Sequence, residues 1–335
     1  MGHIIMPAFA FRSSLSEDSG VRSGLALSEA DMLAHLPVDH HLRERLISDE
    51  VLRLGSDDYA EAVGDLLFAL GATPKPGMPT LGMRLMALLG GDWRSQFALQ
   101  ELLTIEPVAN HYLRLRNQNN DEQAAIFVEL KAMVDGKVGV FDALIEAMTH
   151  DLAFNPHFTR DVANADMVAL TALFASEQLP ADGAQYFDQR FINYLGSQPD
   201  KLGDIHWRQF EGLTAEWFQR SGYDVELGPG RNDGSVDLRL WYRGGQPGAP
   251  PAVIVQCKRQ KQKVERVVVK ALYADMLEER AGAGLVVTTS DVSPGAAKDV
   301  RARAYPITTA NRKQVQDWVQ AMRKPHAGIV SDLIG

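Results

Sequence analysis

The sequence predicts a mostly α-helical N-terminal domain followed by an α/β domain in which helices flank a mixed sheet. Apolar residues recur at intervals of three and four over much of residues 27–200, which is typical of helices that bury one face. From about residue 204 the pattern changes to short β-rich runs that alternate with helical stretches. The predicted order there is α-β-β-β-α-β-α-β-α. This order favours a sheet covered by helices on both faces.

Length and composition are those of a globular protein with about two domains. The chain has 335 residues, of which 45% are hydrophobic and 23% charged. Its single cysteine excludes an intrachain disulfide and a zinc site built from several cysteines. The sequence contains no long apolar run and no basic-then-apolar leader, so we expect a cytoplasmic protein without a membrane partner.

The two halves of the chain carry charge of opposite sign. Residues 201–335 hold 20 Lys and Arg against 15 Asp and Glu, a net charge of +5. Residues 1–200 hold 14 against 28, a net charge of −14. We therefore expect a polyanionic partner on the C-terminal half, with the acidic half serving solubility, regulation or partner binding.

The N-terminal part is predicted to begin with a flexible segment, residues 1–26, which is rich in serine. An α-helical domain, recognition or regulatory, is predicted over residues 27–200. Its first helix starts after Ser28, with acidic residues in the first turn. Further helices are predicted at 58–70, 81–89, 121–134, 140–150 and 185–195.

The second domain is predicted over residues 201–325, with a tail at 326–335. Asp204 is the expected N-cap of its first helix, which ends at Gly222. Ser293-Pro294 is a cap followed by a first-turn proline and predicts the start of a later helix. Strands are predicted at 223–227, 233–241, 252–259, 283–289 and 305–308, and helices at 204–221, 264–280, 293–304 and 311–322.

One hairpin, residues 233–259, carries a possible reactive site. Side chains alternate along a strand, so Gln256 and Lys258 share one face, and Asp237 on the neighbouring strand lies opposite them. A carboxylate, an amide oxygen and an ammonium group in this arrangement can hold a divalent cation and steady a water molecule beside a phosphate. Phosphodiester hydrolysis is the chemistry that this pattern indicates.

Five segments in order strengthen that interpretation. They are Phe210-Glu211, Ser221-Gly222-Tyr223, Asp233-Gly234-Ser235-Val236-Asp237-Leu238, Val255-Gln256-Cys257-Lys258-Arg259 and Val287-Thr288-Thr289-Ser290. Together they resemble the catalytic domain of Mrr-type restriction endonucleases, in the PD-(D/E)xK nuclease superfamily. The resemblance covers roughly residues 204–310 and implies a restriction-endonuclease-like fold for the C-terminal domain. The N-terminal 200 residues resemble no family that we can name.

The resemblance also implies roles for individual residues. Asp237 would ligate Mg²⁺, for which Mn²⁺ could substitute, and Glu211 would support the ion directly or through water. Gln256 stands where most of the superfamily has Glu or Asp, so the site has one charge fewer and one weakly held ion is expected. Lys258 would orient the attacking water. Cys257 points the other way and is expected to be a core residue.

A basic run follows the predicted site: Arg259, Lys261, Lys263 and Arg266. Next to a cation site these side chains are expected to bind DNA phosphates, in a manner that weakens with salt. We therefore expect a magnesium-dependent DNA endonuclease, acting in restriction of foreign or modified DNA or in antiviral defence. A structure-specific nuclease of repair or recombination and an inactive nuclease-fold module that binds DNA or assembles a complex stay open. Possible protein partners are a second copy of the chain or a defence-system protein bound by the acidic domain.

Overall fold

The structure is a computed structural model that describes residues 3–73, 76, 105, 108, 121–137, 139–144, 167–180, 185–230, 236–245 and 248–324. The chain divides into two compact units. One comprises Met1–Ala169 with Lys324–Gly335, and the other comprises Leu170–Arg323. Among the described helices, none has the length and apolar character needed to cross a bilayer.

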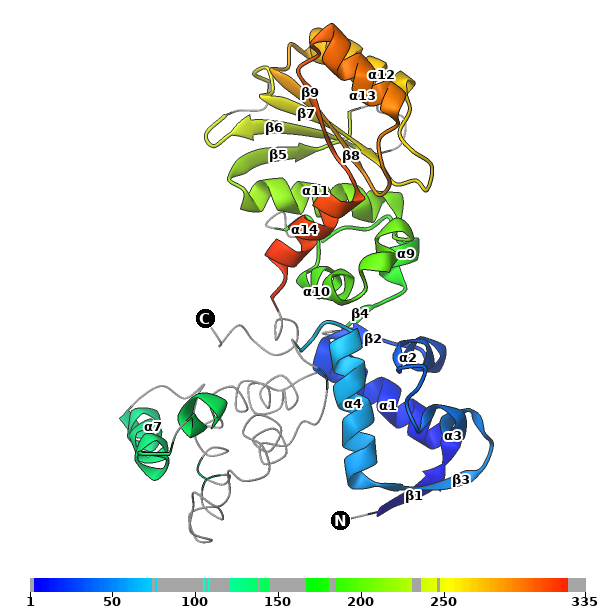
Figure 1. Ribbon diagram of the computed structural model, residues 1–335, viewed down its shortest axis with the longest axis vertical. Coiled ribbons are helices and arrows are strands. Elements are labelled where there is room, and N and C mark those ends of the chain that lie inside the picture. Colours follow the sequence, from blue (N-terminus) through cyan, green and yellow to red (C-terminus); the bar gives the residue numbers. More distant parts are fainter. Residues whose placement is uncertain are drawn as a thin grey trace. The chain divides into compact units, whose positions relative to one another are not determined.

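The first unit is largely helical, as predicted (Figure 1). Its elements are β1 (His3–Pro7), α1 (Ala8–Ser23), β2 (Leu25–Ala26), α2 (Glu29–His35), α3 (Arg43–Ile47), β3 (Val51–Gly55), α4 (Ser56–Ala69), α7 (Asp121–Met133) and β4 (Val168–Ala169). β1 pairs with β3 antiparallel, and β2 pairs with β4 parallel. Ser28 caps α2 as expected, because its hydroxyl accepts a hydrogen bond from the Asp31 N–H at 3.1 Å.

Of the other predicted helices, 58–70 and 121–134 correspond to α4 and α7. Residues 140–144 are helical, and the rest of the predicted 140–150 helix lies outside the described residues. The predicted helix at 81–89 also lies outside them, as does the expected tail from residue 326.

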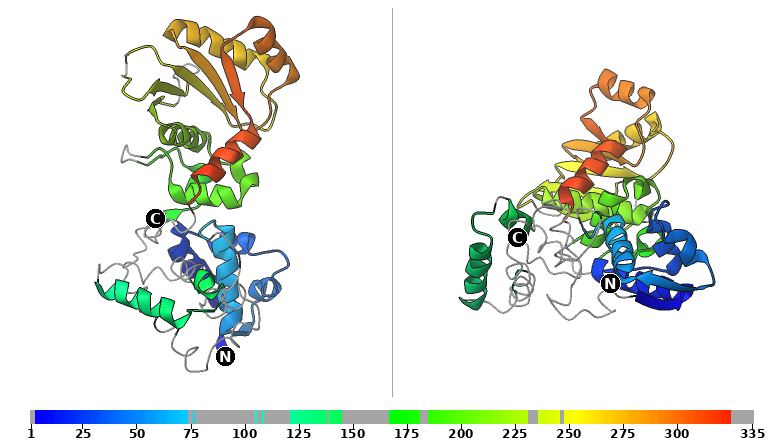
Figure 2. Two further views of the ribbon diagram at one scale, coloured as in Figure 1. Left: turned by 60° about the vertical axis from the view of Figure 1, so that its left-hand side comes forward. Right: turned by 60° about the horizontal axis from the view of Figure 1, so that its bottom comes forward.

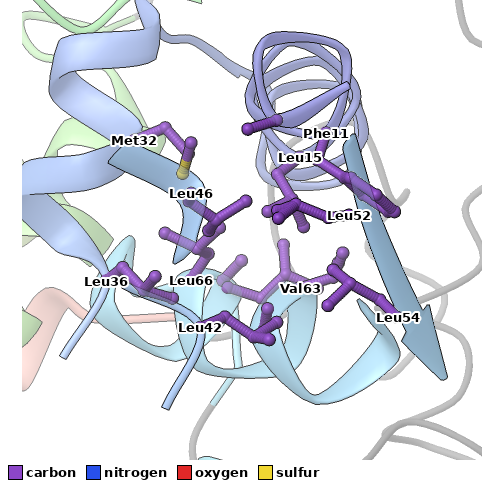
Figure 3. Packing of buried hydrophobic residues seen from close by; sticks show 14 residues of the cluster. Phe11, Leu15, Met32, Leu36, Leu42, Leu46, Leu52, Leu54, Val63 and Leu66 are labelled. Atoms are coloured by element: carbon purple, nitrogen blue, oxygen red, sulfur yellow. The ribbon is translucent and has the colours of Figure 1, made fainter. Parts of the chain in front are cut away.

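A hydrophobic core joins α1 to α4 and β3 in this unit. Figure 3 shows Phe11 and Leu15 of α1 directed toward Val63 and Leu66 of α4, and all four are buried. Leu52 and Leu54 reach the same core because alternate residues of β3 point inward. Burial of this apolar surface is what gives the helical unit its stability.

The expectation of a flexible segment at residues 1–26 is not met, because this stretch forms β1, α1 and β2. Three of its serines, Ser16, Ser19 and Ser23, lie on the inner side of α1, whereas Ser13 is exposed. Ser16 and Ser19 are buried, and the Ser16 hydroxyl donates to the Leu27 carbonyl at 2.7 Å. A Cβ on Gly20 would approach the Leu25 carbonyl to 3.0 Å. Small residues therefore allow the chain after α1 to pack against the helix.

The second unit is built on a five-stranded sheet in the order β5-β6-β7-β8-β9. The strands are β5 (Tyr223–Leu227), β6 (Leu238–Tyr242), β7 (Val253–Lys258), β8 (Ala283–Thr288) and β9 (Ile307–Ala310). β5, β6 and β7 are antiparallel neighbours, whereas β7, β8 and β9 are parallel. This is the mixed sheet that the sequence predicts.

Helices cover both faces of that sheet (Figures 1 and 2). α11 (Trp207–Arg220) and α14 (Arg312–Met322) lie on one face, and α12 (Arg266–Glu279) and α13 (Pro294–Arg303) on the other. α12 covers a core that includes Ile254, Leu272 and Val286. Ser293 caps α13 as predicted by accepting a hydrogen bond from Ala296 N–H.

The second unit begins at Leu170, whereas the sequence analysis placed the domain boundary at residue 200. The added segment contains α9 (Ala172–Ala175), α10 (Gln189–Ser197) and a 3-10 helix, Pro199–Gly203. It belongs to this unit because α10 is bound to the end of α14. Gln189 donates to the Met322 carbonyl at 3.1 Å, and Gln320 donates to the Gly196 carbonyl at 2.7 Å.

The first helix of the sheet domain starts later than predicted. Asp204 ends the 3-10 helix, and the N-cap of α11 is His206, whose Nδ1 accepts a hydrogen bond from the Arg208 N–H at 3.2 Å. An aspartate and an imidazole nitrogen both accept hydrogen bonds, so residue type alone did not distinguish the two positions.

Candidate active site

Asp237 lies just before β6, where a side-chain hydrogen bond to β7 follows the last backbone hydrogen bond. Its backbone N–H donates to the Val255 carbonyl at 2.9 Å. Its carboxylate Oδ2 accepts from the Cys257 N–H at 2.6 Å, so a side-chain oxygen takes the place of a backbone acceptor. The carboxylate is thereby held against β7 between Gln256 and Lys258, because Cys257 separates these two residues. The structure brings Asp237 to the strand that the sequence predicted.

Gln256 and Lys258 emerge on one face of β7. The register pairs Arg239 with Ile254, so Asp237 and Arg239 share a face of the sheet with Ile254, Gln256 and Lys258. This is the α12 face, since Arg239 binds Glu279 of α12 through two hydrogen bonds of 2.8 and 2.5 Å. Gln256 is buried with 4% exposure, and Lys258 is partly exposed.

The Cys257 thiol lies on the opposite face, hydrogen-bonded to Thr214 of α11. Burial raises the pKa of Cys257 well above its usual range, and the charge of Asp237 raises it further. Glu211 also raises this pKa, whereas the bond to Thr214 and the charge of Lys258 lower it. The thiol is therefore neutral near pH 7, although Cys257 as a residue is partly exposed and not fully in the core as predicted.

Glu211 has a partner that the sequence analysis missed. Its carboxylate is buried in α11 and accepts a hydrogen bond from Arg208 Nη1 at 2.7 Å. The spacing of three residues on a helix was the available signal, because such residues are neighbours on the helix surface. Arg208 neutralises part of the Glu211 charge, so a cation near this carboxylate would compete with the guanidinium.

Three hydroxyl groups, which we call the hydroxyl ladder, bind the segment after Lys258 to the end of β8. Thr288 Oγ1 donates to the Lys258 carbonyl at 2.9 Å. Thr289 Oγ1 both donates to the Gln260 carbonyl and accepts from its N–H, each at 3.1 Å. Ser290 Oγ donates to the Gln262 carbonyl at 2.7 Å. The ladder therefore continues the β7–β8 pairing beyond its last backbone pair, Lys258 with Thr288.

The basic side chains after Lys258, which the sequence predicts to bind phosphates, are exposed and lie in two different places. Lys261 and Lys263 line a cleft of about 770 Å³. Arg259 and Arg266 are exposed but are not among the residues that line it. Arg266 is the first residue of α12, and Gly295 lies beside its side chain. Asp233, Gly234 and Ser235 of the predicted motif lie outside the described residues.

Comparison with known proteins identifies a family for this part of the chain. Residues 202–319 match the family model described as "Restriction endonuclease", the Mrr catalytic domain. The C-terminal part of this chain is a restriction endonuclease domain of the Mrr type. The match begins just before α11 and includes the sheet and most of α14. It confirms both the resemblance and the fold class that the sequence predicted.

Two further similarities cover parts of longer proteins. An uncharacterized protein of Sinorhizobium fredii, y4cE, is 27% identical over 138 residues, which are 41% of this chain and 35% of that protein. The chain thus spans about a third of the length of that relative. The MspJI restriction endonuclease, solved in complex with a 27-mer oligonucleotide, shows 18% identity and a TM-score of 0.28, covering 62% of this chain and 47% of that one.

Restriction endonuclease domains generally use divalent metal ions. Within the described part of the chain, no group of three or more His, Cys, Asp and Glu residues could hold one. Asp237 and Gln256 offer a carboxylate and an amide oxygen, and both are oxygen donors that suit Mg²⁺. With Glu211 bound to Arg208, this donor set fits one ion better than two.

Proposed function

We propose that this chain is a metal-dependent DNA endonuclease that hydrolyses phosphodiester bonds. The observation that carries the proposal is the Asp237 carboxylate, which is bound to the backbone of β7 between Gln256 and Lys258. The Mrr-type domain match supports a nuclease that acts on DNA. The basic side chains beside Lys258 support a phosphate-bearing substrate.

Asp237 and Gln256 would hold the Mg²⁺ ion, and Mn²⁺ could substitute for it because both accept oxygen ligands. A bound divalent ion polarises a phosphoryl oxygen and lowers the pKa of a water molecule. Lys258 would orient the attacking water and offset negative charge on the phosphate. Glu211 would act from the other side of β7, directly or through a water molecule, in competition with Arg208.

The biological setting that we propose is restriction of foreign or modified DNA, or antiviral defence, in the cytoplasm. The largely helical first unit would recognise a target, a partner or an activating signal. A homodimer would suit cleavage of both strands, because one site cuts one strand at a time. Arg259, Lys261, Lys263 and Arg266 would bind DNA phosphates in each copy.

A second candidate, a DNA-binding module without catalysis, is favoured by two observations. Gln256 supplies no charge to the site, and the Glu211 carboxylate is bound to Arg208. Asp237 would then be the one carboxylate left to attract a cation among these candidate residues. The two functions differ in whether DNA is cut when a metal ion is present.

The variant Asp237→Asn tests whether the candidate site cuts DNA or only belongs to a DNA-binding module. Asparagine can keep the bond from the Cys257 N–H through its side-chain oxygen but removes the charge. Asp224→Asn is the matched control, because Asp224 also accepts a backbone bond, from Gly244 N–H at 2.7 Å, on strand β5. Unmethylated, methylated and branched DNA would be incubated with each protein, with Mg²⁺ or with a chelator.

We expect wild type and Asp224→Asn to cut one of these DNAs with Mg²⁺, and Asp237→Asn to lose at least about a hundredfold in rate while still binding DNA. Lys258→Met should show a similar loss. Undiminished cleavage by Asp237→Asn would overturn the site. If wild type binds every DNA and cuts none, but Gln256→Glu cuts with Mg²⁺, the module without catalysis is the better description.

A further inference from the structure

A polar cleft adjoins the candidate active site in the second unit. It has a volume of about 770 Å³, and one of its lining residues, Gln260, follows Lys258 by two positions in the sequence. Its lining residues come from four segments: the 3-10 helix that ends at Asp204, the loop after β7, the loop after β8, and the first turns of α14. Four basic side chains line it, Lys261 and Lys263 on the first segment and Arg312 and Lys313 on the last.

The hydroxyl ladder fixes one wall of this cleft relative to Lys258. Thr289 and Ser290, which line the cleft, bind the backbone of Gln260 and Gln262. Thr288 binds the backbone of Lys258. The basic side chains at 261 and 263 therefore extend from a backbone that is tied to the same strand end as the candidate active site.

Arg312 and Lys313 form the opposite wall and were not identified from the sequence. Asn311 accepts a hydrogen bond from the Gln314 N–H and starts α14, which places both basic residues in its first turn. The Arg312 N–H donates to the Ser290 carbonyl at 3.0 Å. This backbone bond joins α14 to the hydroxyl ladder, so both walls meet at Ser290.

Acidic residues pair with three of these cations, and the partner of Lys313 is Asp317, four residues further along α14. Arg312 Nη2 lies 3.4 Å from Asp200 Oδ1, and Lys261 Nζ lies 4.0 Å from Asp204 Oδ1. Asp200 is fully exposed, and the Lys261 side chain is 84% exposed. Exposed pairs of this kind are weak, so a phosphate group can replace the carboxylates.

We propose that this cleft binds the phosphate backbone of the DNA next to the scissile phosphate, and that Arg312 and Lys313 are contacts in addition to those after Lys258. The inference rests on the proposed DNA-cleaving function and adds a second wall to the DNA-binding surface. In the absence of DNA, Asp200 and Asp204 pair weakly with Arg312 and Lys261. Their carboxylates compete with phosphate, so they weaken DNA binding.

The test uses the full chain and a labelled DNA duplex with a chelator present, so that binding is measured without cleavage. The double variant Arg312→Ala/Lys313→Ala is compared with Lys298→Ala/Arg301→Ala, whose residues are exposed on α13 and do not line the cleft. Asp200→Asn is compared with Glu278→Gln, an exposed acidic residue of α12 outside the cleft. Fluorescence anisotropy gives the dissociation constant at several salt concentrations.

We expect the cleft double variant to bind roughly tenfold more weakly at low salt and to lower the salt slope by about two, one for each phosphate contact. Asp200→Asn should bind DNA about two- to threefold more tightly, because it removes a carboxylate that competes with phosphate for Arg312. Both control variants should match wild type. If Arg312 and Asp200 only held the 3-10 helix against α14, both changes would weaken binding.

Failure of the cleft proposal and failure of the proposed nuclease function give different results in this experiment. Wild type that binds and cuts DNA, with a cleft double variant no weaker than its control, overturns the cleft and leaves the nuclease intact. A wild-type protein that binds no DNA in any condition overturns both. Equal weakening by Asp200→Asn and by the double variant also contradicts a phosphate site.

Discussion

At the scale of single residues, Thr288 is a buried hydroxyl that binds the backbone on both sides of the candidate active site's strand end. It is fully buried and binds the carbonyl of Lys258, whose side chain shares a face of β7 with Gln256. Thr288 also accepts a bond from the Ser290 N–H at 3.1 Å, which starts the loop that carries the rest of the ladder. We infer that it is a positioning residue for Lys258.

Thr288→Val keeps the shape of the side chain and removes the hydroxyl. We expect kcat for DNA cleavage to fall by about ten- to a hundredfold, because small displacements of a reacting group are costly, while KM changes little. Thr288→Ser should restore most of kcat. Steady-state kinetics of the three proteins checks this. A serine variant no better than the valine variant would show that packing, and not the hydroxyl, matters at this position.

Gln256 is the candidate-site residue that replaces the Glu or Asp found in most of the superfamily. Its type predicts a weaker cation site, and its burial next to the bound carboxylate of Asp237 agrees with a position inside the site. The replacement by glutamate changes the charge and little else, which is why it distinguishes the two functions proposed above.

At the scale of elements, α11 depends on a glycine that helix propensity alone would not favour. A Cβ on Gly212 would lie 2.7 Å from the Tyr186 carbonyl and 2.8 Å from Leu179 Cδ2. The segment before α10 thus packs directly against the helix at this point. The same helix carries Glu211 and Thr214, so this close contact also positions residues of the candidate site.

Gly212→Ala should therefore destabilise the protein by about 1–3 kcal/mol, the usual cost of overpacking. In an open helix the same change stabilises by up to about 1 kcal/mol. Gly295→Ala is the control, because its Cβ would meet no atom closer than 3.5 Å, on Arg266. Urea unfolding of both variants checks the sign. A Gly212 variant as stable as wild type would contradict the close packing.

At the scale of the whole molecule, the chain consists of two compact units with separate cores. The core around Leu15 belongs to the first unit, and the core under α12 belongs to the second. The sign of the net charge also differs between the two halves of the sequence. Separate cores make separate unfolding transitions the expected behaviour.

Calorimetry of the full chain should resolve two transitions. Leu15→Ala removes a fully buried side chain and should destabilise the first unit by about 2–5 kcal/mol, lowering one transition. Gly212→Ala should lower the other. If each variant shifted a single shared transition, the two units would unfold as one, and the division at Leu170 would not describe independent domains.

The sequence by itself determined the order of elements in the sheet domain and many of their ends. Gly222, Ser293-Pro294 and Asn311 act within a few residues, so turns and caps can be read locally. Alternation along β7 likewise separated Gln256 and Lys258 from Cys257. The family resemblance required several such segments in order, and it located the domain that the comparison confirmed.

Only the tertiary structure decided which distant groups meet. In the folded chain the Asp237 carboxylate accepts a hydrogen bond from the backbone of Cys257, and Arg208 forms an ion pair with Glu211. Arg312 lines the same cleft as the loop after Lys258. The tertiary structure also ordered the serine-rich start of the chain as α1 and joined α10 to α14. These contacts depend on the packing of whole helices against one another and against a sheet. Local spacing constrains such packing weakly, because many arrangements bury the same apolar faces.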